Sequence, residues 1–406
     1  MAGGEQPGTV SAMRFSRPAV AVLALVAAVS ACLGAALAIW LGEDGSTTSA
    51  PVVVTTAGPA GTSPVAVPAL GSTFDPAAIY ARRAPGVVTL YSEFPDGETQ
   101  GSGFVVDSDG AILTNAHVIT NVAEIGATDP VSAAKDVYVE FPDGERVKAT
   151  IVGWDLFNDL GVIKVDPKEH SLRVLPLGDS DAVRVGQPVA AIGSPFGKQS
   201  SLAVGVVSAT GRTIDSLTSR FTIADAIQID APINRGNSGG ALFDAAGRVI
   251  GITAQIQSTS GNAEGVGFAV PIDIAAQALR EILRHGRIDY AYLGIETQDV
   301  TPGLARALGL PATRGALVTT SVPGSPAQKA GIVGGTSTQR VNGRDVAVGG
   351  DVIVAIAGVP VHSTDDVGRI VGRTLRPGQR VTIDLIGRAG RRSVTVTLGK
   401  RPARTQ

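Results

Sequence analysis

Short apolar runs separated by turn residues characterise the chain between residues 73 and 285. Residues 104–106 and 111–113 are two such runs, and Asp107-Ser108-Asp109-Gly110 between them indicates a hairpin, because an Asp-Gly pair readily forms a tight turn. Other strand-like runs occur at 160–165, 227–229 and 248–253. Because the runs are short, rich in Val and Ile and bounded by Gly, Asp and Ser, they predict a mostly β domain built from paired barrels.

Two segments of this region have helical patterns. Residues 76–80, Pro-Ala-Ala-Ile-Tyr, predict a short helix near the start of the domain. Apolar residues at helical spacing over 272–283 predict an amphipathic helix that ends the domain and leads to a second one. With 406 residues, the chain has room for two globular domains and an extension.

An uncharged, apolar stretch lies near the N-terminus, at residues 18–42. As a helix it would be about 37 Å long, enough to cross the hydrocarbon core of a bilayer. Arg14 and Arg17 precede it, whereas Glu43 and Asp44 follow it. By the positive-inside rule, we expect a single-pass transmembrane helix with residues 1–17 in the cytoplasm and both folded domains outside the cell membrane.

Three alternatives exist for the processing of this segment. Val29-Ser30-Ala31-Cys32 resembles a bacterial lipobox, which would leave a lipidated Cys32 at the N-terminus, and an ordinary cleaved signal is another alternative. We favour an uncleaved anchor, because the chain stays apolar after Cys32 as far as Gly42. Residues 43–72 are rich in Gly, Ser, Thr and Pro and are expected to be a linker that holds the next domain away from the membrane.

Composition narrows the range of functions. A net charge of −2 and a pI of about 6.1 give no indication of a basic surface that would bind nucleic acid. The single cysteine excludes an intramolecular disulfide and a cysteine-based zinc site. The four histidines are dispersed and show no metal-ligand spacing. We therefore expect neither a metal ion nor a cofactor.

The segment 236–240, Gly-Asn-Ser-Gly-Gly, carries the clearest chemistry in the chain. Glycines on both sides of Ser238 allow a tight bend that directs backbone N–H groups toward one point, as a tetrahedral oxyanion requires. A serine hydroxyl becomes a good nucleophile only when a neighbouring base accepts its proton. The segment predicts nucleophilic catalysis, provided that a histidine and a carboxylate join it.

His117 is the best candidate for the base. It follows the apolar residues 112–114 and is expected at the end of a buried strand, from which its ring can face a cleft. The other three histidines, His170, His285 and His362, are expected to face solvent or to lie at a helix end.

Asp159 is the candidate for the carboxylate that orients the histidine. It opens the apolar run 160–165, and a carboxylate at the end of a strand can fix the tautomer of an imidazole. Asp155 is the nearest competitor for this role. Asp230 is expected to support the site without contacting the imidazole ring of His117.

The order of these residues separates two classes of serine hydrolase. In α/β-hydrolases a helix follows the Gly-x-Ser-x-Gly segment and the histidine comes last, whereas here a β-like run follows Ser238. The order His117, Asp159, Ser238 is the order of chymotrypsin-type enzymes. It favours a chymotrypsin-like double β-barrel over residues 73–285.

These motifs make the chain resemble the HtrA (Deg) family of serine proteases. The matching runs lie in the family's order at 101–106, 114–119, 158–165, 193–197, 205–208, 236–240 and 265–271. The resemblance implies that His117 is the general base, that Asp159 orients it and that Ser238 is the nucleophile. It also implies that the backbone N–H groups of Gly236 and Ser238 form the oxyanion hole.

The same resemblance implies a substrate preference. It predicts a shallow apolar pocket and cleavage after small aliphatic residues, with Gly265, Val266 and Gly267 offering a strand edge to the substrate. Basic-selective relatives of this fold carry an aspartate six residues before the nucleophile, and this chain has Pro232 there.

Residues 288–400 resemble a PDZ domain of the circularly permuted bacterial type. The matching runs are 292–295, 322–327, 330–331 and 350–356. The resemblance implies that the turn Tyr292, Leu293, Gly294 and Ile295 binds the terminal carboxylate of a peptide. A helix at 365–375 is expected to line the groove with Val367, Ile370 and Val371. Residues 332–348 are an insertion, expected to form a hairpin around Asn342-Gly343.

The resemblance finally implies a role in the cell. It predicts an envelope protease for quality control or stress signalling that acts on unfolded or specific proteins and is modulated by C-terminal peptides. HtrA proteins are typically homotrimers, and the short connection at 92–100 favours a membrane-tethered trimer over a larger cage. The alternative is a PDZ-bearing chaperone or scaffold whose protease domain is largely idle.

Overall fold

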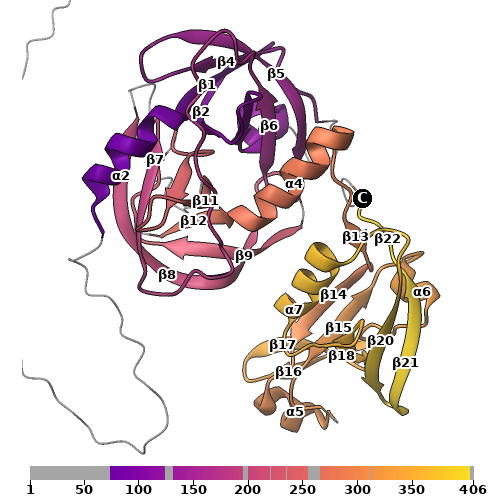
Figure 1. Ribbon diagram of the computed structural model, residues 1–406. Helices are drawn as coiled ribbons and strands as arrows, with labels where there is room; N and C mark the ends of the chain where they lie inside the picture. Colours follow the sequence, from indigo (N-terminus) through magenta and orange to yellow (C-terminus); the bar gives the residue numbers. More distant parts are fainter. Residues whose placement is uncertain are drawn as a thin grey trace, which may run out of the picture. The chain divides into compact units, whose positions relative to one another are not determined.

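The β-rich region between residues 73 and 285 folds into two closed barrels, as the sequence predicts (Figure 1). The computed structural model describes residues 74–123, 131–194, 200–219, 221–234, 236–254, 266–310 and 312–402. All of them fall within one unit, Ala66–Gln406.

The first barrel is antiparallel and closes in the order β1-β2-β3-β6-β5-β4. Its strands are β1 (Val87–Phe94), β2 (Gly97–Val105), β3 (Ala111–Thr114), β4 (Asp136–Glu140), β5 (Arg146–Asp155) and β6 (Leu160–Lys164). The predicted hairpin is the β2–β3 pair, in which Val105 faces Ile112. Asp107 stabilises its turn by accepting the backbone N–H groups of Asp109 and Ala111.

The second barrel closes in the order β10-β11-β12-β9-β8-β7. Its strands are β7 (Pro188–Gly193), β8 (Ser201–Asp215), β9 (Thr222–Ile229), β10 (Ala241–Phe243), β11 (Val249–Ala254) and β12 (Gly267–Pro271). A β-strand therefore follows Ser238, as expected for a chymotrypsin-like enzyme and not for an α/β-hydrolase.

Two helices flank the barrels, and both were predicted. Helix α2 (Pro76–Arg83) begins with Pro at its first position and is capped by Asp75, whose carboxylate accepts the Ala78 N–H at 2.9 Å. Helix α4 (Ile272–His285) ends at Gly286, which has φ 70°. Short 3₁₀ turns occur at Ala84–Gly86 and Asn121–Ala123.

A shared apolar core joins the two barrels and both helices. Buried residues of each element meet in one cluster, which includes Ile79, Phe104, Leu160, Phe243, Ala275 and Ile282. The barrels are thereby fixed against each other, so a residue of one barrel can support a catalytic group of the other.

A second β domain follows α4. Its main sheet has the order β14-β15-β18-β20-β21, with β19 beside β18, and β13 pairs with β22. The strands are β13 (Ala291–Tyr292), β14 (Ile295–Asp299), β15 (Ala316–Ser321), β18 (Val352–Ile356), β19 (Val359–Pro360), β20 (Arg380–Gly387), β21 (Gly390–Thr397) and β22 (Gly399–Lys400). The helices are α5 (Pro302–Leu308), α6 (Pro326–Lys329) and α7 (Thr364–Arg369), and α7 continues as a π-helical turn, Ile370–Thr374.

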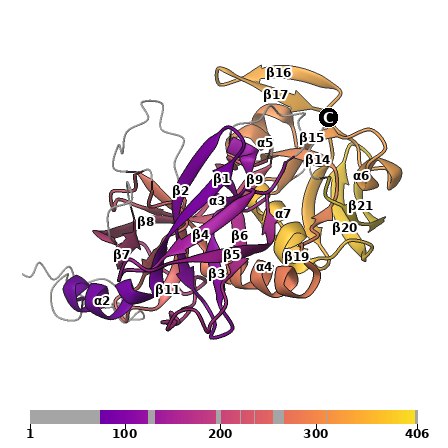
Figure 2. The same cartoon turned by 90° about the horizontal axis from the view of Figure 1, so that it is seen from above.

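The predicted insertion forms a separate two-stranded ribbon, which Figure 2 shows apart from the main sheet. Strands β16 (Ser337–Val341) and β17 (Arg344–Val348) are joined by Asn342 and Gly343, with φ of 50° and 79°. Two successive positive φ angles match the right-handed twist of a hairpin, which explains the Asn-Gly pair.

The expected anchor at 18–42, including Cys32, and the linker at 43–72 lie outside the described residues. Within the ranges that the structure describes, no helix has both the length and the apolar character needed to cross a bilayer.

Candidate active site

His117 and Asp159 come together at one end of the first barrel. Nδ1 of His117 lies 2.7 Å from Oδ2 of Asp159, and the backbone N–H of His117 donates to Oδ1 at 3.0 Å. We expected His117 at the end of a strand. It lies instead in the one-turn helix α3 (Ala116–Ile119), which follows β3. The helical turn places its N–H and its ring on the same side, so both reach the same carboxylate.

Asp159 is held in an unusual backbone conformation between β5 and β6. Its φ is 52°, in the left-handed region, which costs a non-glycine residue about 1–3 kcal/mol. The side-chain N–H of Asn115 compensates by donating to the Asp159 carbonyl at 2.7 Å. Both side chains are buried, Asp159 with 1 % exposure. The surroundings therefore determine the position of this carboxylate closely.

The electrostatics suit His117 for proton transfer. Burial by itself lowers the pKa of His117, because it disfavours the charged imidazolium. The charge of Asp159 and its hydrogen bond act in the opposite direction and outweigh burial, so the net pKa of His117 is raised. A carboxylate at Nδ1 holds the proton there and leaves Nε2 free to accept another.

Ser238 lies in a glycine-rich bend with 3 % exposure. Gly236 has φ 94° and Gly239 has φ 85°, conformations that favour glycine. A side chain at Gly239 would also place Cβ only 2.1 Å from the carbonyl oxygen of Ser102. Backbone conformation thus requires glycine at both positions, and close approach to Ser102 also requires it at Gly239.

Ser102 on β2 was not singled out from the sequence, although it supports the serine-bearing bend. Its backbone N–H donates to the Ser238 carbonyl at 2.8 Å, and its hydroxyl donates to the Gly236 carbonyl at 2.5 Å. The Thr114 hydroxyl donates to the Ser102 carbonyl at 2.6 Å, and the backbone N–H of Ser194 donates to the Ser102 hydroxyl at 2.8 Å. The only signal in the sequence is a serine between two glycines, Gly101 and Gly103, which says nothing about its partners.

The structure brings the Ser238 segment close to the His117 segment. The Cβ of a side chain at Gly101 would lie 2.6 Å from the side chain of Val118 and 3.3 Å from the Ser238 carbonyl. Oγ of Ser238 is buried and has no hydrogen-bond partner in the described part of the chain. In unliganded enzymes, catalytic hydrogen bonds are often long and tighten only when the substrate binds.

The competing acids lie elsewhere. Asp155 is buried and bonds to Tyr290 and Asn158, and Asp230 is exposed and accepts the Val206 N–H at 2.6 Å. Neither has a hydrogen bond to His117 among those of the described residues.

Two of the remaining histidines are exposed, as expected. His285 ends α4 and pairs with Glu281 at 3.3 Å, and His362 faces solvent. The expectation for His170 is wrong, because its side chain is only 12 % exposed and stacks on Phe141 with ring centroids 3.7 Å apart.

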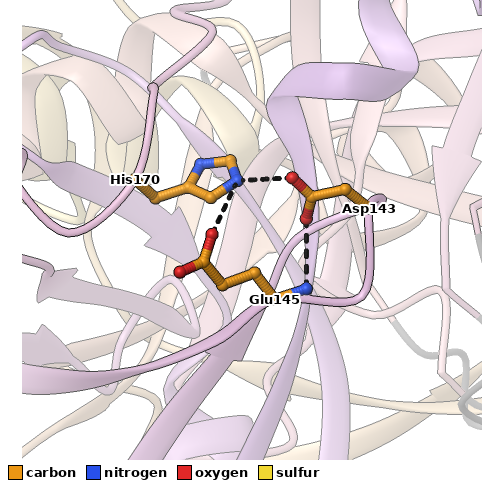
Figure 3. A group of neighbouring side chains, drawn as sticks. All are labelled: Asp143, Glu145 and His170. Carbon is orange, nitrogen blue, oxygen red and sulfur yellow. Dashed lines mark hydrogen bonds and ion pairs between the residues drawn. The ribbon is translucent and has the colours of Figure 1, made fainter.

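His170 belongs to a group of three potential metal ligands among the described residues (Figure 3). Its Nε2 lies 2.9 Å from Asp143 and 3.8 Å from Glu145, and its hydrogen bond lowers the pKa of Asp143. A metal-bound imidazole normally donates its other N–H to an acceptor. Nδ1 of His170 is buried and has no partner in the described ranges, so the group fits a hydrogen-bonded cluster better than a metal site.

The strand edge expected at 265–267 is described in part. Gly265 lies outside the described residues, Val266 is 39 % exposed, and Gly267 pairs with Ile229 of β9. Pro232 is exposed.

The expected peptide-binding residues of the second domain line a cavity of about 330 Å³, with one exception. Those that line it are Tyr292, Leu293, Gly294, Ile295, Val367 and Val371. Ile370 instead packs into the core of the domain, with 2 % exposure. Ile370 begins the π-helical turn that follows α7, and its side chain packs on the apolar residues of the domain core, away from the cavity.

Comparison with known proteins supports the interpretation of the barrels. Residues 101–252 match the family of trypsin-like peptidase domains. A "Probable periplasmic serine endoprotease DegP-like" of Hahella chejuensis is 36% identical over 324 residues, covering 80% of this chain and 60% of that protein. The protein of the same description in Halomonas elongata is 38% identical over 302 residues, covering 74% and 56%. The chain therefore spans less than two thirds of the length of these curated relatives.

Solved structures are similar over nearly their whole length. The HtrA-type protease AlgW, solved with a tripeptide, has 35% identity and a TM-score of 0.66, covering 81% of this chain and 98% of its own. The serine endoprotease from Yersinia pestis has 29% identity and a TM-score of 0.58, with the same coverage. His117, Asp159 and Ser238 all lie within the peptidase match, and the AlgW chain is covered almost completely, so this chain belongs to the HtrA family of trypsin-like serine proteases.

Proposed function

We propose that the chain is an extracytoplasmic serine endopeptidase in which Ser238 is the nucleophile, His117 the general base and Asp159 the residue that orients His117. The observation that carries the proposal is the 2.7 Å contact between Nδ1 of His117 and Oδ2 of Asp159, together with a glycine-framed Ser238. Modification of Ser238 by a serine-reactive fluorophosphonate tests it directly.

The mechanism follows from the positions of these groups. Ser238 Oγ attacks the carbonyl carbon of a peptide bond while Nε2 of His117 accepts the hydroxyl proton. Asp159 stabilises the imidazolium that forms, and the backbone N–H groups of Gly236 and Ser238 stabilise the oxyanion. His117 then donates the proton to the leaving amine, and water releases the acyl group by the same path in reverse.

The substrates are unfolded or specific envelope proteins, cleaved after small aliphatic residues. Pro232 in place of an acid supports this preference, because a buried carboxylate is what selects a Lys or Arg side chain. Residues 265–267 offer a strand edge to the substrate, as the resemblance to the HtrA family implies.

The second domain is a PDZ domain that modulates the protease by binding C-terminal peptides. The cavity between the Tyr292–Ile295 turn and α7, with apolar walls at Val367 and Val371, supports the proposal. AlgW was solved with a tripeptide, which supports a peptide as the ligand. The relatives described as periplasmic support an extracytoplasmic location. The resemblance to the HtrA family further implies that residues 18–42 anchor the protein in the membrane and that it assembles as a homotrimer.

The pH dependence of activity is the first prediction. We expect kcat/KM to fall as the pH decreases through the pKa of His117, because only the neutral imidazole accepts the Ser238 proton. Since the Asp159 carboxylate outweighs burial and raises this pKa, the loss should begin at a higher pH than for a free imidazole, whose pKa is about 6.5. Initial rates on a fluorogenic peptide, with circular dichroism at each pH as the folding control, measure it. A rate that stays constant down to about pH 4 would contradict His117 as the base.

Peptide binding by the second domain is the next prediction. The Val371→Ala variant should bind a C-terminal peptide about tenfold more weakly, because the wall of the groove loses about 1–2 kcal/mol of apolar contact. Fluorescence anisotropy with a labelled peptide ending in a free carboxylate measures the affinity. Val359→Ala is the matched control, since Val359 is 44 % exposed and does not line the cavity. Equal binding of the amidated peptide would refute recognition of the carboxylate.

A further inference from the structure

A closed triangle of hydrogen bonds lies next to the candidate active site. The Tyr290 hydroxyl donates to Oδ2 of Asp155 at 2.6 Å. The side-chain N–H group of Asn158 donates to the same carboxylate at 2.8 Å and to the Tyr290 hydroxyl at 2.7 Å. All three residues are buried, with exposures of 2 % for Asp155, 9 % for Asn158 and 7 % for Tyr290. The mechanism described above uses none of them.

The triangle fixes the turn that presents Asp159. Asp155 ends β5, Asn158 directly precedes Asp159, and Oδ1 of Asp155 accepts the Phe157 N–H at 2.9 Å. The hydroxyl of Thr218 donates to the Leu156 carbonyl in the same turn. The residues that directly precede the strained Asp159, whose φ is 52°, are thus held by hydrogen bonds.

We propose that Tyr290 is a positioning residue for the orienting carboxylate: its hydroxyl locks Asp155 and Asn158, and through them holds Asp159 against His117. The inference rests on the function proposed above. In the sequence, Tyr290 follows α4 and directly precedes β13, the first strand of the second β domain. The connection between the two domains therefore contributes a side chain that supports the active site.

The hydroxyl, and not only the ring, is needed at this position. Burial raises the pKa of Asp155, which means that its charged form depends on the donors around it. The donors to its carboxylate include the Tyr290 hydroxyl, the Asn158 side-chain amide and the backbone N–H groups of Phe157 and Asn158. Burial and the charge of Asp155 also raise the pKa of Tyr290 well above its usual value, so the phenol keeps its proton and donates.

Tyr290 is itself held firmly. Its carbonyl accepts the Arg401 N–H at 2.9 Å, and its ring packs edge-on against Phe157 with centroids 5.5 Å apart. The Arg401 guanidinium lies 5.5 Å from the centre of the Tyr290 ring. A side chain fixed in this way can transmit its position to the Asp155–Asp159 turn.

The Tyr290→Phe variant of the full chain tests the inference, because it removes the hydroxyl and keeps the ring. We expect kcat on a peptide substrate to fall about tenfold with KM unchanged, since a small displacement of a catalytic group lowers the rate of the chemical step. We also expect the acid limb of the pH–rate profile to move to lower pH, because Asp159 then raises the pKa of His117 less. A residue with a purely structural role would leave this limb in place.

The matched control is Tyr138→Phe, in β4 of the first barrel, which should leave kcat and the acid limb unchanged. A double variant adds a second test. If the hydroxyl acts through Asp155, then Tyr290→Phe combined with Asp155→Asn should be no slower than the slower single variant. Fully additive losses, or a Tyr290→Phe enzyme with the kcat and acid limb of the control, would overturn the inference.

A readout independent of turnover separates this inference from the proposed function. NMR titration of His117 should give a lower pKa in Tyr290→Phe than in the unmodified chain, whether or not the protein hydrolyses peptides. A lowered melting temperature with an unchanged His117 titration would overturn the positioning role and leave Tyr290 as a packing residue. Absence of hydrolysis by the unmodified chain would instead count against the proposed function.

Discussion

The Ser238→Ala variant is expected to hydrolyse peptide bonds roughly 10⁵- to 10⁶-fold more slowly than the unmodified protein and to retain its fold. The loss should be this large because the hydroxyl is the group that forms the acyl intermediate, and His117 and Asp159 act only through it. The fold should survive because Ser238 Oγ has no hydrogen-bond partner among the described residues. The loss of turnover is measured as the initial rate on an unfolded protein substrate. The loss of the nucleophile is measured by fluorophosphonate labelling, which should also disappear.

Ser108→Ala is the matched control for this experiment. Ser108 is exposed in the β2–β3 turn, so its substitution should change neither labelling nor turnover. Turnover retained by purified Ser238→Ala would refute the assignment of the nucleophile. Labelling of the unmodified chain only in the presence of a C-terminal peptide would indicate an enzyme switched by the second domain. No labelling under either condition would favour the alternative of a scaffold with an idle protease domain.

Much of the fold could be predicted because its determinants are local. The Asp109-Gly110 turn between two apolar runs specifies the β2–β3 hairpin, and Asn342-Gly343 specifies the β16–β17 hairpin through its two positive φ angles. The alternation of apolar runs and turn residues agreed with the double barrel that the order His117, Asp159, Ser238 favoured, because the strands are short and most consecutive strands within a barrel pair.

The parts of the site that could not be predicted depend on contacts between distant segments. Ser102 supports the Ser238 bend across 134 residues, and Asp155 meets Tyr290 across 135 residues. No pattern within one segment indicates such a partner. The burial of His170 has the same origin, because its stacking on Phe141 joins a loop to a hairpin turn. Local patterns therefore specify the elements, whereas the hydrogen bonds that hold the catalytic groups arise from tertiary packing.

The Asp159→Asn variant should show the second large effect, a decrease in kcat of roughly 10⁴-fold. Oδ1 of an asparagine can still accept the His117 N–H, so the backbone of α3 should stay in place. The amide N–H₂, however, replaces the Oδ2 atom that lies 2.7 Å from Nδ1 and cannot accept a proton there. The imidazole would then carry its proton on Nε2, the atom that must accept the Ser238 proton, and the base would be lost.

The asparagine also removes the charge that raises the pKa of His117, so whatever activity remains should have its acid limb at lower pH. Asp230→Asn is the matched control, because Asp230 is exposed and an asparagine keeps the acceptor that bonds the Val206 N–H. Steady-state kinetics of the two variants side by side measure the difference. A loss of less than about tenfold in Asp159→Asn would show that another acid orients His117. The buried Asp155 would then be the first residue to substitute, because its turn leads directly to β6.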